Sequence, residues 1–212
     1  MEKFVINGKK KLKGEVCIAG AKNAALGIIP ASILSDEVCR IENLPMIKDI
    51  QNYINILKKL DADVHEISER CFEISTENIQ YKNTDSAHDE ICNMRASYYL
   101  IGALLGKYRY VEIPFPGGCD IGTRPIDLHL KGFKALGAEV SIESGKVRAR
   151  AKKLVGAPIF LDVVSVGATI NIMLAATRAE GVTTIENAAK EPHVVDIANF
   201  LNLMGAQIKG AG

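Results

Sequence analysis

Three stretches of the sequence are apolar on nearly every side of a helix: residues 22–34, about 93–106 and about 165–179. A helix that is apolar all round is normally buried. We therefore expect these stretches to form helices at the centre of the fold. Pro30 lies inside the first one, and because proline removes a backbone donor we expect a kink there.

A second pattern follows each apolar stretch, namely an amphipathic helix that runs into a strand, and these segments end at Val64, Val140 and Ile208. In the middle segment the apolar positions form a stripe, made of Leu128, Leu130, Phe133 and Leu136. We expect these second helices to pack against the central three with their lysines outward. Strands should then surround the core.

Shorter strand patterns precede the amphipathic helices, at residues 33–43, 109–114 and 178–187. The patterns together define three similar units, at about 21–90, 91–156 and 157–212. Residues 1–20 precede them and are expected to form N-terminal strands. The sequence therefore predicts an α/β fold of three repeated units, with buried central helices and outer sheets.

The middle unit is longer than its neighbours between its short strand and its second helix. This interval spans 23 residues, from Ile113 to Leu136, whereas it spans 19 in each of the other two units. About four residues are therefore inserted, in the loop that contains Cys119. A repeat that departs from its own pattern at one loop indicates a functional feature there.

The third unit is incomplete at the sequence level. Paired strand patterns follow the second helix of the first two units, at residues 63–75 and 138–151, but the third unit stops at AQIKGAG. An unpaired sheet edge is a liability. We expect the chain to be an N-terminal piece of a longer protein, or another segment to complete that sheet.

Composition narrows the function classes. The 212 residues are 48% hydrophobic and 24% charged with a formal net charge of +1, which argues against duplex DNA or an anionic membrane surface as a partner. Tryptophan is absent and aromatic residues make up 6%, which weakens a single-stranded nucleic-acid interpretation. The five cysteines form no CxxC pair, so neither a disulfide framework nor a structural zinc site is indicated. With no apolar segment of signal-peptide or membrane-spanning length, we expect a soluble cytoplasmic protein.

The inserted loop, PFPGGCDIGTRPIDLH at residues 114–129, presents a cysteine. Gly117 and Gly118 allow positive φ and therefore a sharp bend beside Cys119. Arg124 and the helix start indicated by Pro125 would each lower the pKa of a nearby thiol. The alternative is a small buried side chain without chemistry. A cysteine hydrolase is disfavoured, because no histidine is tied to Cys119 by a recognisable spacing.

The starts of the three central helices carry small, amide, hydroxyl and cationic residues: Gly20, Lys22 and Asn23; Asn93, Arg95 and Ser97; and Ser165, Gly167 and Thr169. Exposed backbone donors and the helix dipole favour anions at such positions. If the units are related by approximate threefold rotation, the starts converge on a pocket suited to phosphate or carboxylate. Lys22, Arg95 and Arg124 would line it, and Cys119 would reach it. The alternative is ordinary helix capping with solvated cations.

Two further polar residues stand at the start of the second helix in the middle unit. Asp127 is explained as a first-turn acid that complements the helix dipole. His129 is interpreted as a surface or hydrogen-bonded histidine rather than as a base. The sequence contains no P-loop, GxGxxG or HExxH pattern, so it indicates no nucleotide-binding loop or metal site of those kinds.

Several of these segments together identify a family resemblance: GEVCIAGAKNAAL, NMRAS, PGGCDIGTRPIDLHLKGFKALGA, DVVSVGATINIMLAAT and IENAAKEP. The chain resembles the N-terminal half of the UDP-N-acetylglucosamine enolpyruvyl transferases, or 1-carboxyvinyltransferases. The resemblance implies an inside-out α/β barrel of two similar three-unit domains, with the active site between them. It also implies that residues 1–20 belong partly to the other domain.

The activity implied by the resemblance is the first committed step of peptidoglycan synthesis. Enolpyruvate passes from phosphoenolpyruvate to the 3-hydroxyl of UDP-N-acetylglucosamine and phosphate is released, with no metal or organic cofactor. The expected partners are these two substrates and a C-terminal domain that is absent here. Because that domain supplies an aspartate near the sugar and further arginines, this chain alone should be nearly inactive.

The resemblance also assigns roles to single residues. Cys119 matches a loop cysteine that donates a proton, forms an adduct with phosphoenolpyruvate and is alkylated by fosfomycin. The positions matching phosphoenolpyruvate contacts are Lys22, Asn23 and Arg124. Those matching contacts to the UDP-sugar are Arg95, Arg124, Pro125, Ile126, Asp127, Leu128, Ser165, Val166 and Gly167. Some family members carry a lysine where this chain has Val163, so one diphosphate contact is expected to be missing or replaced.

Two alternatives remain open beside this hypothesis. The shikimate-pathway enolpyruvyl transferase has a similar fold, but it typically has a serine–lysine pair after the first strand and no loop cysteine. This chain has Ala21, Lys22 and Asn23 there, and it has Cys119. The other alternative is a noncatalytic repeat scaffold that binds phosphorylated ligands or protein partners, which predicts an inert Cys119.

Overall fold

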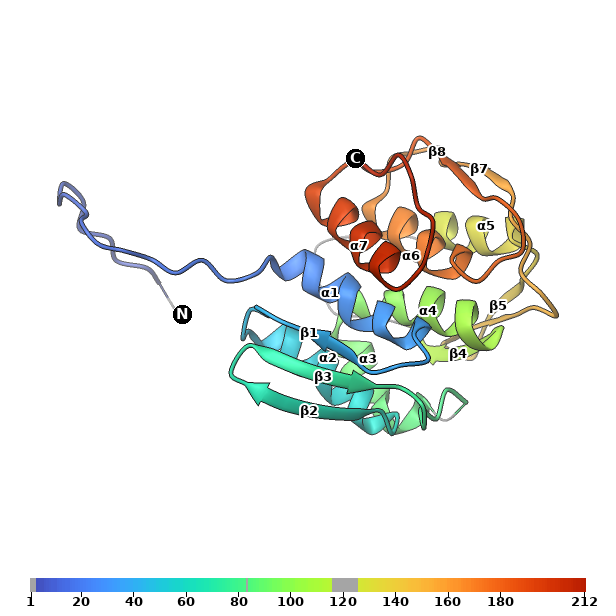
Figure 1. Ribbon diagram of the computed structural model, residues 1–212, viewed down its shortest axis with the longest axis horizontal. Coiled ribbons are helices and arrows are strands. Elements are labelled where there is room, and N and C mark those ends of the chain that lie inside the picture. Colours follow the sequence, from blue (N-terminus) through green and yellow to red (C-terminus); the bar gives the residue numbers. More distant parts are fainter. Residues whose placement is uncertain (1–2, 83, 116–125) are drawn as a thin grey trace.

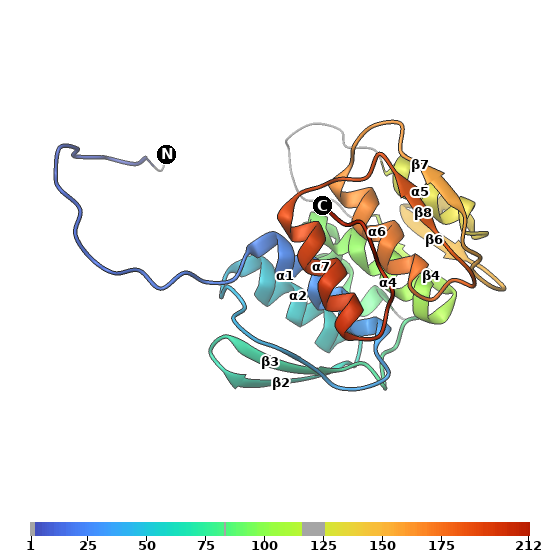
Figure 2. The same ribbon diagram turned by 45° about the horizontal axis from the view of Figure 1, so that its top comes forward.

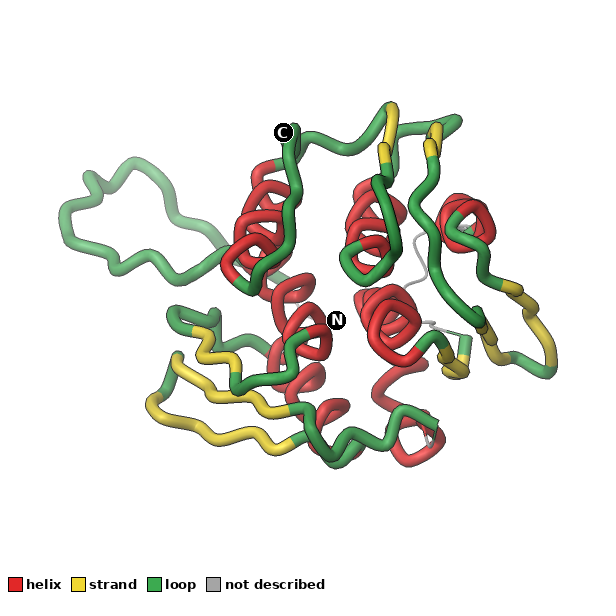
Figure 3. The backbone as a smooth tube through the Cα atoms, turned by 45° about the vertical axis from the view of Figure 1, so that its right-hand side comes forward, coloured by secondary structure: helices red, strands yellow, loops and turns green. Residues whose placement is uncertain are grey.

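The computed structural model describes residues 3–82, 84–115 and 126–212. Three apolar helices occupy its centre: α1 (Lys22–Ala31), α4 (Tyr99–Tyr108) and α6 (Val166–Ala176). Their inward side chains are fully buried, as at Ile29, Leu104 and Leu174. Figures 1 and 3 show them side by side. The predicted central helices are therefore confirmed.

The boundaries of these helices differ slightly from the prediction. Pro30 is the penultimate residue of α1, and the chain continues as the tighter 3₁₀ helix η1 (Ser32–Leu34). The predicted helix at 93–106 is interrupted at Met94, whose backbone is extended. The chain then enters the 3₁₀ helix η3 (Arg95–Tyr98), which leads directly into α4. The central helix of the second unit therefore begins later than predicted, at Tyr99, and the short η3 turn precedes it.

The first unit adds a three-stranded antiparallel sheet and an amphipathic helix, formed by β1 (Cys39–Ile41), α2 (Lys48–Lys59), β2 (Asp63–Ser68) and β3 (Cys71–Ser75). The strand order is β1-β3-β2, so the last strand lies in the middle. The helix buries Tyr53, Ile56 and Leu57 and exposes Lys58 and Lys59, as its sequence pattern predicts.

The second unit repeats this arrangement with β4 (Tyr110–Pro114), α5 (Asp127–Ala135), β5 (Glu139–Glu143) and β6 (Lys146–Arg150), in the order β4-β6-β5. Between the sheets of the first two units lie η2 (Thr84–Ala87) and α3 (His88–Asn93), and α3 crosses the predicted boundary at about residue 90. Val147 and Ala149 point into the core while Arg148 and Arg150 are exposed, which is the period-two pattern of a one-sided sheet. Both predicted strand pairs are therefore confirmed.

The third unit contains β7 (Pro158–Phe160), β8 (Thr184–Glu186) and α7 (Pro192–Leu203), and its two strands pair in parallel. Residues 205–212 follow α7 without forming a strand. They are held to the helix through Asn202, whose amide donates to the Ile208 carbonyl oxygen at 2.9 Å and accepts from the Ile208 N–H at 2.7 Å. The sheet of this unit therefore has fewer described strands than those of its neighbours.

The prediction of strands within residues 1–20 is wrong for the part that the structure describes. Residues 3–20 form no strand and extend away from the rest of the molecule (Figures 1 and 2). Phe4 and Leu12 are almost fully exposed. A strand is stable only when its backbone groups and apolar face find a partner. Contact with the fold begins at Gly20, whose N–H donates to the Asn43 carbonyl oxygen at 3.1 Å.

Candidate functional site

The central helices α1, α4 and α6 each begin at their left-hand end in Figure 1, and the start of α5 lies against that of α6, where His129 packs on Gly167. The central helices run in the same direction, so the positive ends of their dipoles share that end. The convergence of these helix starts on one anion-binding pocket stays a prediction. Cys119, Arg124 and Pro125 lie outside the described residues.

Lys22 and Asn23 are both exposed at the start of α1. The Lys22 ammonium lies 3.0 Å from Asp49 Oδ2, with the two side chains 50% and 42% exposed. Exposed ion pairs contribute little to stability, so an anion of higher charge can replace this carboxylate at small cost. Lys22 is thus a cation with a readily exchanged partner.

Arg95 opens η3 and is half-buried. Its guanidinium lies 5.7 Å from the centre of the Tyr98 ring, in a cation–π arrangement. The stacking leaves the fork of N–H donors at the edge of the guanidinium, the geometry that suits phosphate oxygens. Arg95 is therefore a second cation at this end of the central helices.

The start of α5 alternates between buried and exposed side chains. Ile126 is 2% exposed and anchors the chain in the core, while Asp127 points outward and Leu128 is half-buried. His129 is 5% exposed. The interpretation of His129 as a hydrogen-bonded histidine is confirmed, because its Nδ1 lies 2.9 Å from the Asn171 amide nitrogen.

The start of α6 is capped by Ser165, whose Oγ accepts a hydrogen bond from the Ala168 N–H at 3.3 Å. Its carbonyl oxygen also accepts from Thr169 Oγ1 at 2.8 Å. Helix capping therefore explains why a serine stands at position 165, as the alternative to an anion site predicted. The N–H groups of Val166 and Gly167 precede the first intrahelical hydrogen bond and remain suited to an anion.

Gly167 connects the starts of α5 and α6. A Cβ atom built on it would lie 3.2 Å from both Cε1 and Nε2 of His129, so the histidine ring lies directly against the backbone of this turn. Burial, and then the positive charge of Arg95, lowers the pKa of His129 to about 4. The structure therefore places the His129 imidazole, which its low pKa keeps neutral at physiological pH, close to Arg95 and against Gly167.

Sequence reasoning missed Asn171. It lies in the middle of α6, is fully buried, and bonds to His129 and to the first turn of α4. The available signal was a single amide side chain within the apolar run GATINIMLAAT. Buried polar groups need hydrogen-bond partners, so such a residue indicates a network at the helix interface.

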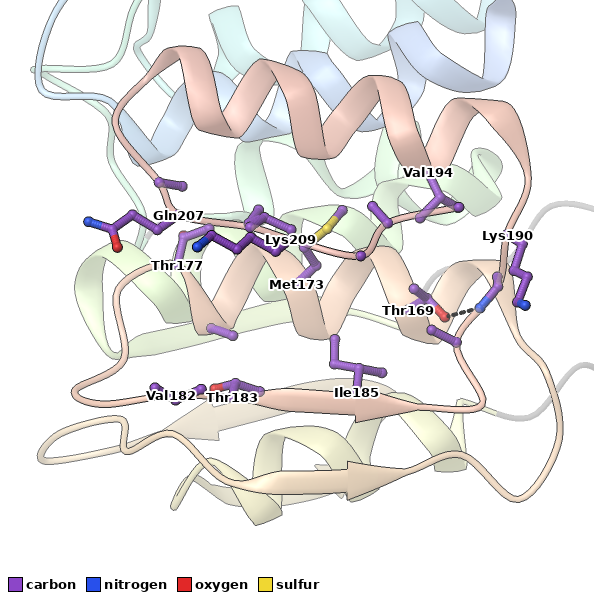
Figure 4. A pocket seen from close by; sticks show the side chains of 18 of the residues that line it. Thr169, Met173, Thr177, Val182, Thr183, Ile185, Lys190, Val194, Gln207 and Lys209 are labelled. Atoms are coloured by element: carbon purple, nitrogen blue, oxygen red, sulfur yellow. Dashed lines mark hydrogen bonds between the residues drawn. The ribbon is translucent and has the colours of Figure 1, made fainter.

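A cavity of about 1240 Å³ lies elsewhere, between α6, α7, β8 and residues 205–212 (Figure 4). Of the candidate residues at the helix starts that the structure describes, Thr169 lines this cavity, whereas Lys22, Arg95 and the Ser165–Gly167 turn do not. Two buried oxygens beside it, Thr183 Oγ1 and Glu191 Oε2, have no hydrogen-bond partner among the residues that the structure describes. The cavity therefore touches the start of α6 through Val164 and Thr169 but is not lined by the Ser165–Gly167 turn itself.

Comparison with known families decides the classification. The sequence model of the EPSP synthase family, 3-phosphoshikimate 1-carboxyvinyltransferase, matches residues 6–212. The chain belongs to the EPSP synthase family. Among curated relatives in this family, it is 57% identical over 212 residues to UDP-N-acetylglucosamine 1-carboxyvinyltransferase 3 of Caldanaerobacter subterraneus. It is 56% identical over 213 residues to UDP-N-acetylglucosamine 1-carboxyvinyltransferase of Clostridium botulinum.

Solved structures of family members share the fold. The enolpyruvyl transferase NikO from Streptomyces tendae matches 97% of this chain with a TM-score of 0.81 at 22% identity. EPSP synthase from Acinetobacter baumannii matches 97% with a TM-score of 0.72 at 17% identity. The expected enolpyruvyl transferase fold is thereby confirmed.

The alignments cover all of this chain but only part of each relative. The chain spans 50% of the Caldanaerobacter protein, 51% of the Clostridium botulinum protein and 48% of the NikO chain. The chain therefore spans about half the length of these family members. Within its described residues, no helix is both long enough and apolar enough to cross a bilayer.

Proposed function

We propose that this chain forms the N-terminal half of a UDP-N-acetylglucosamine 1-carboxyvinyltransferase. The observation that carries the proposal is the 57% identity with the Caldanaerobacter relative, which extends over all 212 residues. The arrangement of the helix starts supports it, because a reaction between two phosphorylated substrates needs several anion-binding groups close together. The reaction belongs to peptidoglycan synthesis and takes place in the cytoplasm.

The proposed reaction proceeds by addition and elimination. The 3-hydroxyl oxygen of the sugar forms a bond to C2 of phosphoenolpyruvate, its proton passes to the aspartate expected in the C-terminal half, and C3 accepts a proton. Loss of that carbon-bound proton and of inorganic phosphate then regenerates the double bond, now on the sugar ether. Cys119 is the proposed proton donor to C3, and neither a metal nor an organic cofactor takes part.

Lys22, Asn23 and Arg124 are the proposed contacts to phosphoenolpyruvate. The exposed Lys22–Asp49 ion pair supports this role, since the ammonium can exchange the carboxylate for a phosphate without the penalty of breaking a buried pair. An arginine beside it would bind the substrate carboxylate or phosphate in a bidentate manner. These cations would also hold the phosphate as it leaves.

The proposed UDP-sugar contacts lie on three segments: Arg95, residues 124–128 and residues 165–167. The Ser165–Gly167 turn suits the diphosphate because helix-start N–H groups and the dipole both favour negative charge. Val163, which is 67% exposed, carries no charge where some family members have a lysine. We expect this difference to weaken nucleotide-sugar binding without changing the reaction.

A second acceptor deserves a direct comparison, because the matching family model is named for 3-phosphoshikimate 1-carboxyvinyltransferase. The decisive test measures phosphate release from phosphoenolpyruvate with UDP-N-acetylglucosamine or shikimate 3-phosphate as acceptor. It uses residues 1–212 joined to the C-terminal half of the Clostridium botulinum relative, with this chain alone beside it. Release with the UDP-sugar only, and from the joined protein only, is expected. Release with shikimate 3-phosphate instead would reject the proposed substrate.

The role of Cys119 has its own test. After fosfomycin treatment of the joined protein with UDP-N-acetylglucosamine present, intact-mass analysis should show one covalent adduct, and Cys119→Ser should show none. A protein that binds the sugar nucleotide but forms no adduct and releases no phosphate would instead be the noncatalytic scaffold.

A further inference from the structure

The side chain of Asn171 joins the two central helices α4 and α6 at a fully buried point. Its Oδ1 accepts a hydrogen bond from the Gly102 N–H at 2.7 Å, and its Nδ2 donates to the Tyr98 carbonyl oxygen at 2.8 Å. One amide thus pairs with a donor and an acceptor of the same turn of α4. Nδ2 has a second proton, and it lies 2.9 Å from His129 Nδ1.

The direction of this amide is fixed by its partners. A backbone N–H can only donate and a carbonyl oxygen can only accept, so Oδ1 must face Gly102 and Nδ2 must face Tyr98. The absence of a side chain at Gly102 makes the approach possible, because a Cβ atom there would lie 2.3 Å from both the backbone oxygen and Oδ1 of Asn171. Asn171 therefore presents a donor, and not an acceptor, to the histidine.

The donor determines the protonation of His129. Since Nδ1 accepts the hydrogen bond, the neutral imidazole carries its proton on Nε2. The Nε2 edge of the ring is the edge that lies against Gly167 at the start of α6. The low pKa of His129 agrees with a ring that is neutral at physiological pH.

We propose that Asn171 is a positioning residue, which fixes His129 as the Nε2–H tautomer against the first turn of α6. An N–H donor thereby faces the Ser165–Gly167 turn, where the proposed function places the diphosphate of the sugar nucleotide. The inference rests on that proposed function for its ligand. The position of the proton on His129 depends only on the contacts within this chain.

Asn171→Asp provides the sharpest test, because it changes the donor at Nδ1 into an acceptor while keeping the shape of the side chain. NMR of the imidazole nitrogens in the 212-residue chain should show the proton on Nε2 in the wild type and on Nδ1 in the variant. The dissociation constant for UDP-N-acetylglucosamine, measured by calorimetry, should rise about tenfold or more, as expected when a hydrogen bond to a charged group is lost.

Asn202→Asp is the matched control. The side chain of Asn202, on α7, also hydrogen-bonds to both a backbone N–H and a backbone carbonyl oxygen, those of Ile208. This variant should lose stability while retaining both the Nε2–H tautomer of His129 and the nucleotide-sugar affinity. Asn171→Leu is the second variant if Asn171→Asp does not fold, and it should broaden the histidine signals into a mixture of tautomers.

The outcomes separate this inference from the proposed function. A wild-type His129 with its proton on Nδ1, or an Nε2–H tautomer unchanged in every Asn171 variant, would overturn the inference. Unchanged affinity despite a changed tautomer would also overturn it. If the tautomer follows the prediction but the wild-type chain joined to the C-terminal half of the Clostridium botulinum relative does not bind UDP-N-acetylglucosamine, the positioning of His129 stands and the proposed function fails.

Discussion

Acidification should destabilise this chain through His129. The ring is 5% exposed, and burial followed by the charge of Arg95 lowers its pKa from 6.5 to about 4. The unfolded chain therefore binds a proton at this residue as pH falls through about 6.5, whereas the folded chain does so only near pH 4. Since the unfolded state binds more protons in this window, the free energy of unfolding must decrease as pH falls.

The pKa difference sets the size of the effect. Linkage gives about 2.5 kcal/mol between about pH 7 and pH 4.5, and about 3 kcal/mol by pH 4. Urea unfolding followed by circular dichroism, at several pH values across this range, measures it. His129→Gln is the comparison, because it cannot titrate in this window.

The difference in unfolding free energy between wild type and His129→Gln should shrink by about 2.5 kcal/mol as pH falls to 4.5. Paired carboxylates such as Asp36 and Glu112, whose pKa values are lowered mainly by Arg178 and Arg148, titrate in both proteins and cancel in the difference. Parallel curves for the two proteins would refute the reasoning, because they would show that His129 is not held neutral by the fold.

Two packing predictions are independent of pH. Gly102→Ala should lower the free energy of unfolding by about 2 kcal/mol or more, because the added Cβ would lie 2.3 Å from the backbone oxygen of Asn171. A loss below about 0.5 kcal/mol in urea unfolding would contradict that close approach. Lys107→Met should cost about 1–3 kcal/mol, since this side chain is 13% exposed and its ammonium lies 3.3 Å from Asp36. Lys153→Met, at an exposed side chain, should cost less than about 0.5 kcal/mol. Equal losses in the two lysine variants, measured by the same unfolding assay, would show that burial does not decide their contributions.

The sequence patterns were sufficient for the helices and strands that bury a face within this chain. The all-apolar helices around Ile29 and Leu174 can bury every face only at the centre of the fold. The hairpin strands around Phe72 and Val147 pair with strands only a few residues away in the sequence. Strands were also expected within residues 1–20, but a sequence alone cannot say whether a pairing partner for them is present. Over residues 3–20 the structure shows none.

The contacts of the candidate site were only partly predictable. The positions of Lys22 and Ser165 follow from helix starts that the sequence predicts to within a residue, whereas Arg95 lies in a 3₁₀ turn that precedes α4. The ion pair of Lys22 with Asp49 and the hydrogen bond of Asn171 to His129 join residues that lie 27 and 42 positions apart. Such pairs depend on how the helices pack against one another. The periodicity of a single sequence does not indicate which distant residues this packing brings into contact.

The most direct test of the account is to map where UDP-N-acetylglucosamine binds on the 212-residue chain, by following backbone amide signals in an NMR titration. We predict that the largest shifts occur at Arg95, at residues 127–129 and at residues 165–167, which surround one end of the central helices. Shifts confined to the cavity between α7 and β8, around Thr183 and Lys209, would contradict the account.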